Sequence, residues 1–395
     1  MCKQHFYVIG LTDEQAYHPT QEVLAVIANG KVFSGGVRHH EIVSSMLPAD
    51  SRWIDITVPL DDVFSQYEHT AEVVVFASGD PLFFGFANTI RRRLPDAEIT
   101  VYPAFNSLQM LAHRMLLPYH DMRTVSLTGR PWDGLDTSLI RGERLIGVLT
   151  DRHKTPSTIA QRMLEYGYDN YRMTVGELLG NHDREQVRSF SLLEASQTEF
   201  AFPNCIILEQ QQERPHPFGI PETAFHLLDG RVNMITKAPI RLLTLSMLDL
   251  SNRQSFWDIG FCTGSVSIEA KLQFPHLQVT AFEQREAGQE LMDKNTRKFG
   301  TPGITACIGD FLQTDISQLP APDAVFIGGH GGKLKEIMQK VNQVLLPHGV
   351  IVFNAVSESS RDMFVEGTKE IRRNLTGHVH VAIDSFNPID IMKAE

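Results

Sequence analysis

Residues 258–270 read DIGFCTGSVSIEA, which is the end of a buried strand, a turn with two glycines and the start of a helix. Gly260 and Gly264 bracket this turn between the apolar segment 255–259 and the helical segment 265–274. Such a turn directs backbone N–H groups and the positive end of a helix toward a polar or acidic ligand, and glycine allows close approach of the backbone. The stretch therefore predicts a cofactor site at the end of a strand.

Beyond this turn, apolar strand segments alternate with amphipathic helical segments. They are QVTAFE (278–283), GQELMDKNTRKFG (288–300), ITACIGD (304–310), DAVFIGG (323–329), LKEIMQKVNQVL (334–345) and GVIVFNAV (349–356), followed by the period-2 segment HVHVAID (378–384). Alternation of this kind is typical of a doubly wound α/β fold. We therefore predict a Rossmann-like domain over residues 222–395.

A second α/β region precedes this domain. Residues 209–225 carry three prolines, a glycine and a polar run, so we predict a linker at 211–221. Before it, strand and helix patterns alternate in two groups, which predicts two small α/β subdomains with a largely parallel sheet, about 1–118 and 119–210. A chain of 395 residues is long enough for such a division.

Composition excludes several classes of protein. The formal net charge of -11 argues against a nucleic-acid partner, which usually needs a clustered basic face. No segment resembles a signal peptide or a membrane span, so we expect a cytoplasmic location and no membrane partner. The four cysteines lie far apart, and the adjacent His39 and His40 have no third ligand nearby, so neither a disulfide framework nor a metal site is expected.

The strand ends favour S-adenosylmethionine over a dinucleotide as the cofactor. A dinucleotide turn would need glycine at Cys262 and Ser265, which makes an oxidoreductase the poorer interpretation. We expect Asp258 to meet the cofactor's ammonium group through water or the backbone. Glu283 would accept both ribose hydroxyls, because a carboxylate offers two acceptor oxygens. Asp310 would accept a hydrogen bond from the adenine amino group, and Phe311 would cover the adenine ring. The full predicted set of cofactor contacts in this domain is Asp258, Gly260, Thr263, Gly264, Glu283, Asp310 and Phe311. The alternative is that these acidic residues merely cap helices.

The segment FIGGHGGKL (326–334) surrounds His330 with four glycines. Such a loop could bring substrate against the backbone at Gly329 and Gly331, with His330 as a proton donor or acceptor. The alternative is a flexible glycine loop with a solvated histidine.

These C-terminal segments carry a family resemblance. NMITKAPIRLLTLSML (233–248), DIGFCTGSVSIEA, FIGGHGGKL and NPIDIM (387–392) resemble the methyltransferases of corrin biosynthesis that methylate carbon 15 of the macrocycle and decarboxylate a ring acetate. The resemblance covers nearly all of residues 222–395. Cys262 stands where that family usually has glycine, so we expect its side chain to narrow the cofactor turn.

A second strand-turn-helix, VVVFASGDPLFFG, lies at residues 73–85. Gly79 permits close backbone approach, Asp80 is predicted to cap the following helix, and Pro81 fits the first helical turn. Taken alone, this pattern is common in any α/β protein.

Together with SGGVRHHEIV (34–43), VYPAFNSLQMLAHRM (101–115), VSLTGRP (125–131), VLTD (148–151), TPSTIAQRML (155–164) and VGELLG (175–180), this motif resembles the tetrapyrrole methylase family over residues 5–210. The closest likeness is to members that methylate carbon 5 of a corrin precursor. The resemblance implies a cofactor folded between two subdomains and bound by Gly79, Asp80, Pro81, Leu82, Phe83, Asn106, Ser107 and Thr150. Gly10 is followed by LTDEQ, whereas the family typically has a glycine-rich loop.

A polycarboxylate macrocycle would need local cations. Arg38, His39, His40 and Arg130 are predicted to supply positive potential for it, whereas Arg91–Arg93 fit the solvated end of a helix. The two resemblances imply a fused methyltransferase of cobalamin biosynthesis, which methylates precorrin-6B or its cobalt form at carbons 5 and 15 and decarboxylates it. Self-association is expected by the resemblance. Two alternatives remain: one active domain only, or a non-catalytic tetrapyrrole carrier.

Overall fold

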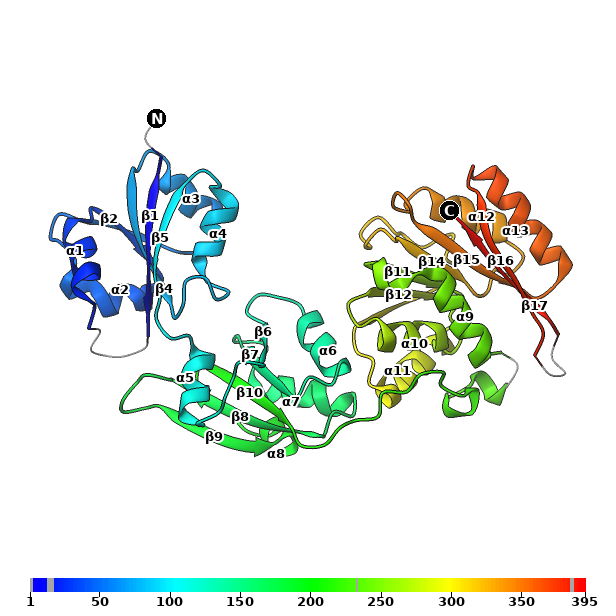
Figure 1. Ribbon diagram of the computed structural model, residues 1–395, viewed down its shortest axis with the longest axis horizontal. Helices are drawn as coiled ribbons and strands as arrows, with labels where there is room; N and C mark the ends of the chain where they lie inside the picture. Colours follow the sequence, from blue (N-terminus) through cyan, green and yellow to red (C-terminus); the bar gives the residue numbers. More distant parts are fainter. Residues whose placement is uncertain (1–2, 13–17, 232–233, 384–386) are drawn as a thin grey trace. The chain divides into compact units, whose positions relative to one another are not determined.

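The computed structural model describes residues 3–12, 18–231, 234–383 and 387–395 (Figure 1). The chain forms two compact units. The first contains Met1–Arg130, Arg144–Gln161 and Tyr171–Gln211, and the second contains Pro131–Glu143, Arg162–Asn170 and Gln212–Glu395. Within the second unit, Thr137 Oγ1 donates to Pro275 O at 3.0 Å and Tyr168 OH donates to Gly300 O at 2.7 Å. The domain limits derived from the sequence stay a prediction.

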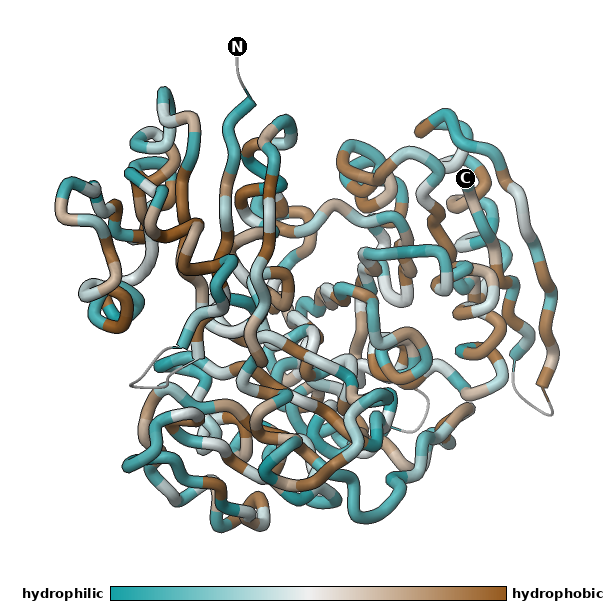
Figure 2. Tube along the Cα trace, turned by 60° about the vertical axis from the view of Figure 1, so that its left-hand side comes forward, coloured by the Kyte–Doolittle hydropathy of each residue, from teal (hydrophilic) through white to brown (hydrophobic). Residues whose placement is uncertain are grey.

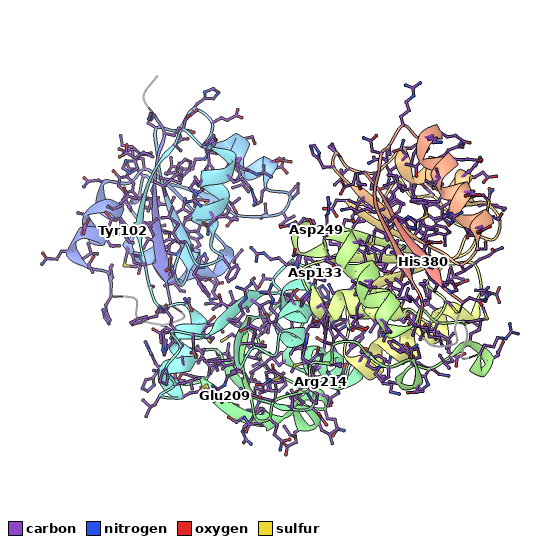
Figure 3. All side chains as sticks on the ribbon, turned by 45° about the vertical axis from the view of Figure 1, so that its right-hand side comes forward. Tyr102, Asp133, Glu209, Arg214, Asp249 and His380 are labelled. Carbon is purple, nitrogen blue, oxygen red and sulfur yellow. The ribbon has the colours of Figure 1, made fainter. Side chains whose placement is uncertain are left out.

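The first sheet of the first unit is entirely parallel, with the order β3-β2-β4-β1-β5. Its strands β1 and β4 are central and buried because their sequences are nearly continuous apolar runs. Brown segments in Figure 2 follow such strands. Tyr102 ends the edge strand β5, where its hydroxyl donates to Glu22 Oε1 at 3.2 Å (Figure 3). The elements are β1 (His5–Leu11), α1 (Gln21–Asn29), β2 (Val32–Gly35), α2 (Val37–Val43), β3 (Arg52–Asp55), α3 (Asp61–Tyr67), β4 (Glu72–Ser78), α4 (Phe86–Arg93) and β5 (Glu98–Tyr102).

The second sheet of this unit is mixed, with the order β6-β7-β10-β8-β9. Only β6 and β7 pair in parallel, because β8 and β9 form a hairpin and β10 runs antiparallel to both of its neighbours. The expected largely parallel pairing therefore holds for the first sheet and not for this one. The elements are α5 (Ser107–Arg114), β6 (Arg123–Ser126), β7 (Leu145–Leu149), α7 (Pro156–Glu165), β8 (Tyr171–Glu177), β9 (Gln186–Ser191), α8 (Leu192–Ser196) and β10 (Asn204–Gln210).

The second unit is built on a seven-stranded sheet with the order β13-β12-β11-β14-β15-β17-β16. The first five strands are parallel, and β17 runs antiparallel to both β15 and β16. This confirms the doubly wound, Rossmann-like fold. The elements are α6 (Asp133–Ile140), α9 (Ala238–Leu248), β11 (Ser255–Ile259), α10 (Ser265–Gln273), β12 (Gln278–Glu283), α11 (Ala287–Phe299), β13 (Ile304–Ile308), β14 (Ala324–Ile327), α12 (Leu334–Asn342), β15 (Val350–Ala355), α13 (Glu358–Glu370), β16 (Leu375–Val381) and β17 (Ile389–Ala394).

One local prediction in the first unit is wrong. Helix α4 begins at Phe86 after an N-cap at Gly85, five residues later than expected, so Asp80 does not cap it and Pro81 is not in its first turn. Asp80 Oδ1 instead accepts a hydrogen bond from Leu82 N at 2.8 Å. The chain folds back before the helix starts, and a side chain at Gly85 would lie 2.4 Å from Pro81 O.

Of the helices in the described ranges, not one combines the length and the apolarity that crossing a bilayer requires. Within the same ranges, no three His, Cys, Asp or Glu side chains are grouped so that they could hold a metal ion.

Candidate functional site

A pocket of about 650 Å³ lies at the carboxyl ends of β11 and β14 in the second unit. It brings together the predicted cofactor turn and the predicted substrate loop, since both Gly260 and Gly329 line it. Gly260 has φ +79°, and a Cβ there would lie 2.5 Å from the backbone nitrogen of Gly329. Only glycine therefore lets the two loops touch at this point.

Two buried polar atoms of the cofactor turn have no protein partner. Asp258 is 1% exposed; its Oδ2 accepts from Ser267 N at 3.1 Å and from Ser267 Oγ at 2.6 Å. Asp258 Oδ1 and Thr263 Oγ1 have no hydrogen-bond partner within the described part of the chain, and both residues line the pocket. Such atoms are rare in folded proteins unless a ligand or water meets them. Burial raises the pKa of Asp258 to about 7.

Glu283, at the end of β12, holds the turn in place. Its Oε2 accepts from Cys262 N at 2.9 Å, and its Oε1 accepts from Arg285 N at 3.0 Å and from Arg285 Nη1 at 3.2 Å. Each carboxylate oxygen has two acceptor positions, so Oε2 keeps one and Oε1 is fully used. Binding of both ribose hydroxyls by Glu283 would require the Arg285 side chain to move.

Asp310 and Phe311 do not line this pocket. Asp310 Oδ1 accepts from Leu312 N at 2.9 Å and Oδ2 accepts from Lys333 Nζ at 3.1 Å, and these bonds lower the pKa of Asp310. Phe311 is 6% exposed and packs edge-on against Phe282 and Trp257 in the core. The adenine contacts expected at Asp310 and Phe311 therefore stay a prediction.

His330 lies on the loop beside the pocket, although its own side chain does not line it. Its Nδ1 accepts from Gly332 N at 3.2 Å, and its ring lies 5.7 Å from the ring of Phe353. The bond to Nδ1 places the proton of the neutral imidazole on Nε2. Burial lowers the pKa of His330, so this neutral form predominates at neutral pH. Gly331, in the same loop, has φ +53°.

Cys262 has φ +53°, which is uncommon for a residue with a side chain. Its Sγ donates to Met234 O at 3.1 Å and so fastens residues 234–237 to the cofactor turn. Burial, followed by the charge of Glu283, raises the pKa of the Cys262 thiol. The other predicted glycine of the turn, Gly264, has φ +74° and would bring a Cβ within 2.6 Å of Met292 Sδ.

Sequence reasoning missed several polar residues that line the pocket: Thr236, Lys237, Arg285, Asn354 and Asn387. They come from loops and from the end of β15, far apart in the sequence. The segment 233–248 was noticed only as part of the resemblance. Met234 of this segment contacts the cofactor turn through Cys262, and no periodic pattern reveals that contact.

A second pocket, of about 270 Å³, lies in the first unit. It joins six predicted residues: Arg38, Gly79, Phe83, Asn106, Ser107 and Thr150. Gly79 has φ +63°, and a Cβ there would lie 2.8 Å from Asn106 Cα. A Cβ on Gly10 would lie 2.1 Å from Gly79 O, so these strand ends meet without room for side chains. The predicted residues Asp80, Pro81, Leu82, His39 and Arg130 do not line it.

Protein partners already orient the polar groups of this second pocket. Asn106 caps α5 by accepting from Gln109 N at 3.0 Å. Thr150 Oγ1 lies 2.6 Å from Asn204 O and 2.7 Å from Asn204 Oδ1. In the loop after Gly10, residues 13–17 lie outside the described residues.

The prediction that His39 supplies positive charge is wrong. Burial, helped by the charge of Arg38, lowers the pKa of His39 to about 4, so the ring is neutral at neutral pH. Its Nδ1 accepts from Gly36 N at 3.2 Å and its Nε2 lies 2.9 Å from Ser78 Oγ. His39 therefore links α2 to the end of β4 by hydrogen bonds. His40 stacks on Trp53 with ring centroids 4.2 Å apart.

The comparisons with known proteins match two successive parts of the chain, the first of which includes residues 131–143 and 162–170 of the second unit. Residues 5–195 match the family model of tetrapyrrole (corrin/porphyrin) methylases, and residues 227–392 match that of the precorrin methyltransferase domain. A Sinorhizobium protein called precorrin-6Y C(5,15)-methyltransferase [decarboxylating] is 31% identical over 353 residues, which is 89% of this chain and 84% of the relative.

Two further proteins match the chain in part. The cobalt-precorrin-6B C(15)-methyltransferase (decarboxylating) of Salmonella typhimurium is 39% identical over 41% of this chain and 83% of its own length. A crystal structure of a precorrin-6y C5,15-methyltransferase from Geobacter metallireducens shares 32% identity over 46% of this chain and 99% of that chain, with a TM-score of 0.42. The similarity to the Sinorhizobium relative, above all, shows that the chain belongs to the family of decarboxylating precorrin-6Y C(5,15)-methyltransferases.

Proposed function

We propose that this chain transfers two methyl groups from S-adenosylmethionine to a precorrin, at carbons 5 and 15, and removes carbon dioxide from one ring acetate. The observation that carries the proposal is the pair of unpartnered atoms, Asp258 Oδ1 and Thr263 Oγ1, in the large pocket beside Gly260. A buried carboxylate oxygen there fits a cationic ammonium group. The name of the Sinorhizobium relative supports the two methylated carbons and the decarboxylation. The proposal also includes the two expectations from the sequence that the protein is cytoplasmic and that it self-associates.

When bound, S-adenosylmethionine supplies an electrophilic methyl group. In the second unit, Asp258 and Thr263 would bind the amino-acid end of the cofactor, and Gly260 would let the cofactor approach the backbone closely. In the first unit, Gly79 would likewise let the cofactor approach the backbone closely, beside Asn106 and Thr150. The nucleophile is a carbon of the electron-rich macrocycle, so the protein mainly aligns the reactants and excludes water.

Decarboxylation breaks the bond between the acetate carbon and its carboxyl group. The electron pair enters the conjugated macrocycle, carbon dioxide leaves, and a proton is delivered to the product. We propose that His330 controls that proton as a general acid in its protonated form, which leaves the neutral ring after transfer, because Gly328 and Gly329 of its loop line the pocket.

Product analysis tests the whole proposal. The purified chain is incubated with a precorrin and S-adenosylmethionine labelled in its methyl group, and the products are identified by mass spectrometry. We expect two labelled methyl groups and the loss of one carbon dioxide. One methyl group would indicate that a single domain is active. Binding of the macrocycle without binding of S-adenosylhomocysteine would favour the carrier alternative.

His330→Ala is expected to slow decarboxylation by about a hundredfold, which lies within the range for loss of a general acid or base. Methylation at carbon 5 should continue, because that reaction is assigned to the other unit. The measurement is the ratio of decarboxylated to methylated product over time. Decarboxylation at the normal rate in this variant would remove His330 from the mechanism.

The pKa of Asp258 predicts a pH dependence of cofactor binding. With a pKa of about 7, Asp258 is protonated below pH 7 and ionised above it, and an ammonium group prefers the ionised form. Affinity of the second unit for S-adenosylhomocysteine should therefore fall by up to about tenfold for each pH unit below 7. Asp258→Asn should bind weakly at pH 8 and show a flat profile. Calorimetric titration at several pH values measures both, and an equally steep profile in the variant would contradict the assignment.

A further inference from the structure

Two loops at the carboxyl ends of β6 and β7 border the pocket of the first unit. Thr128 and Thr150 line that pocket, and each is followed two residues later by an arginine, Arg130 and Arg152. Gly129 N donates to Asp151 Oδ2 at 3.2 Å, so a hydrogen bond joins the two loops. The two arginines therefore lie on joined loops that border the pocket, although neither side chain lines it.

Each of these guanidinium groups lies over an exposed phenylalanine ring. Arg152 Cζ is 4.6 Å from the ring centroid of Phe202, which is 42% exposed and lines the pocket. Arg130 Cζ is 5.2 Å from the ring centroid of Phe84, which is 40% exposed. An arginine stacked in this way keeps its N–H donors at the edge of the plane, where they can reach a carboxylate in bidentate geometry.

The carboxylate nearest in sequence, Asp151, is occupied by backbone groups. Its Oδ1 accepts from His153 N at 2.8 Å and from Lys154 N at 2.6 Å, in addition to the bond from Gly129 N to Oδ2. Burial alone would raise the pKa of Asp151, but these N–H groups lower it, so the carboxylate stays ionised and holds the loop.

Neither arginine is neutralised by the protein around it. Across the ranges that the structure describes, Arg130 and Arg152 form no ion pair with an Asp or Glu side chain. Arg130 uses one donor on Ser126 Oγ, at 2.7 Å. Two positive charges thus remain on the loops that border the pocket, in a chain whose formal net charge is -11.

We propose that Arg152, together with Arg130, forms a two-arginine site that binds carboxylate side chains of the macrocycle at the pocket of the first unit. The two phenylalanine rings would pack against the flat conjugated face, and the two guanidinium groups would pair with carboxylates at its edge. Arg152 is then a specificity-determining residue. This inference rests on the proposed function, because it takes the ligand to be a polycarboxylate tetrapyrrole.

The test uses a stable octacarboxylate porphyrin and the same porphyrin with its carboxylates converted to amides. Binding to the full chain is followed by the absorption of the porphyrin. Arg152→Ala is expected to weaken one carboxylate-dependent binding event by about tenfold, which is typical for loss of one hydrogen-bonded charge pair. Arg152→Lys should recover part of it, because lysine keeps the charge but not the planar fork. The amide should bind all variants equally.

The matched control is Arg91→Ala, which removes an exposed arginine near the end of α4 that does not line the pocket. Its porphyrin binding should equal that of the unchanged chain. Unchanged porphyrin binding in Arg152→Ala, or no preference for the carboxylate over the amide, would overturn the two-arginine site. Titration of each variant with S-adenosylhomocysteine separates the two hypotheses. If the unchanged chain does not bind S-adenosylhomocysteine, the result counts against the proposed function. Porphyrin binding that depends on Arg152 would still support the two-arginine site.

Discussion

Replacing Gly260 by alanine should weaken the binding of S-adenosylhomocysteine to the second unit by about 100-fold and leave the first unit unaffected. The new Cβ would overlap the backbone of Gly329 at 2.5 Å, and backbone cannot rotate away as a side chain can. The positive φ of +79° adds strain for any residue with a side chain. Overpacking of about 1–3 kcal/mol and left-handed strain of about 1–2 kcal/mol together support this magnitude.

Calorimetric titration of the full chain measures this result as the loss of one of two binding sites. Gly79→Ala provides the complementary variant, because its Cβ would lie 2.8 Å from Asn106 Cα at φ +63° in the other pocket. Gly167→Ala is the matched control: its φ is +69°, yet its Cβ would approach nothing closer than 3.7 Å. If Gly260→Ala and Gly167→Ala bind equally well, the overlap with Gly329 is not what shapes the pocket.

The second large effect is expected from Arg241→Leu, which should lower the free energy of unfolding of the second unit by about 3–5 kcal/mol. Arg241 and Glu269 are both fully buried, with Arg241 Nε 2.7 Å from Glu269 Oε2. Arg241 also donates to Thr236 O at 2.8 Å and to Ile220 O. The variant therefore removes a donor from two carbonyls and leaves the buried Glu269 carboxylate without its cation, with the N–H groups of Gly219 and Ile220 still donating to it. Thr236 lines the pocket, so cofactor affinity should fall as well.

Denaturant unfolding of the full chain provides the measurement. Arg297→Ala is the control, because Arg297 and Glu165 form an exposed pair at 2.9 Å whose loss should cost less than about 1 kcal/mol. The double variant Arg241→Met with Glu269→Gln should regain part of the stability, since it removes the unpaired buried charge and keeps an oxygen acceptor for the two backbone N–H groups that donate to Glu269. A loss in Arg241→Leu no larger than in Arg297→Ala would contradict this account.

Periodic patterns predicted the fold well. The predicted segments 255–259, 278–283, 304–310 and 323–329 contain the parallel strands β11 to β14, because long apolar runs and amphipathic helices leave few alternatives. Strand β9 was missed because its residues are mostly exposed, and a hairpin edge needs no continuous apolar run. Strand β17 was seen only as a family-like segment, and its position inside the sheet depends on pairing over long sequence distances.

The site was predictable where backbone conformation decides it. Gly79, Gly260 and Gly264 all have positive φ, as their turns require. Side-chain roles were harder, because they depend on neighbours that lie far away in the sequence. Phe311 is buried by Trp257 and Phe282, and nothing in its local pattern distinguishes a core ring from one that covers a cofactor.

The position of β17 also constrains the order in which the nascent chain can assemble. β16 leaves the ribosome before β17, yet its only neighbour in the sheet is β17. Until β17 emerges, β16 has no partner and β15 keeps an open edge that could pair with another chain. Asn387 and Pro388, directly before β17, and Ile389, its first residue, also line the pocket of the second unit. This pocket can therefore be completed only after β17 has been synthesised, late in the translation of this unit.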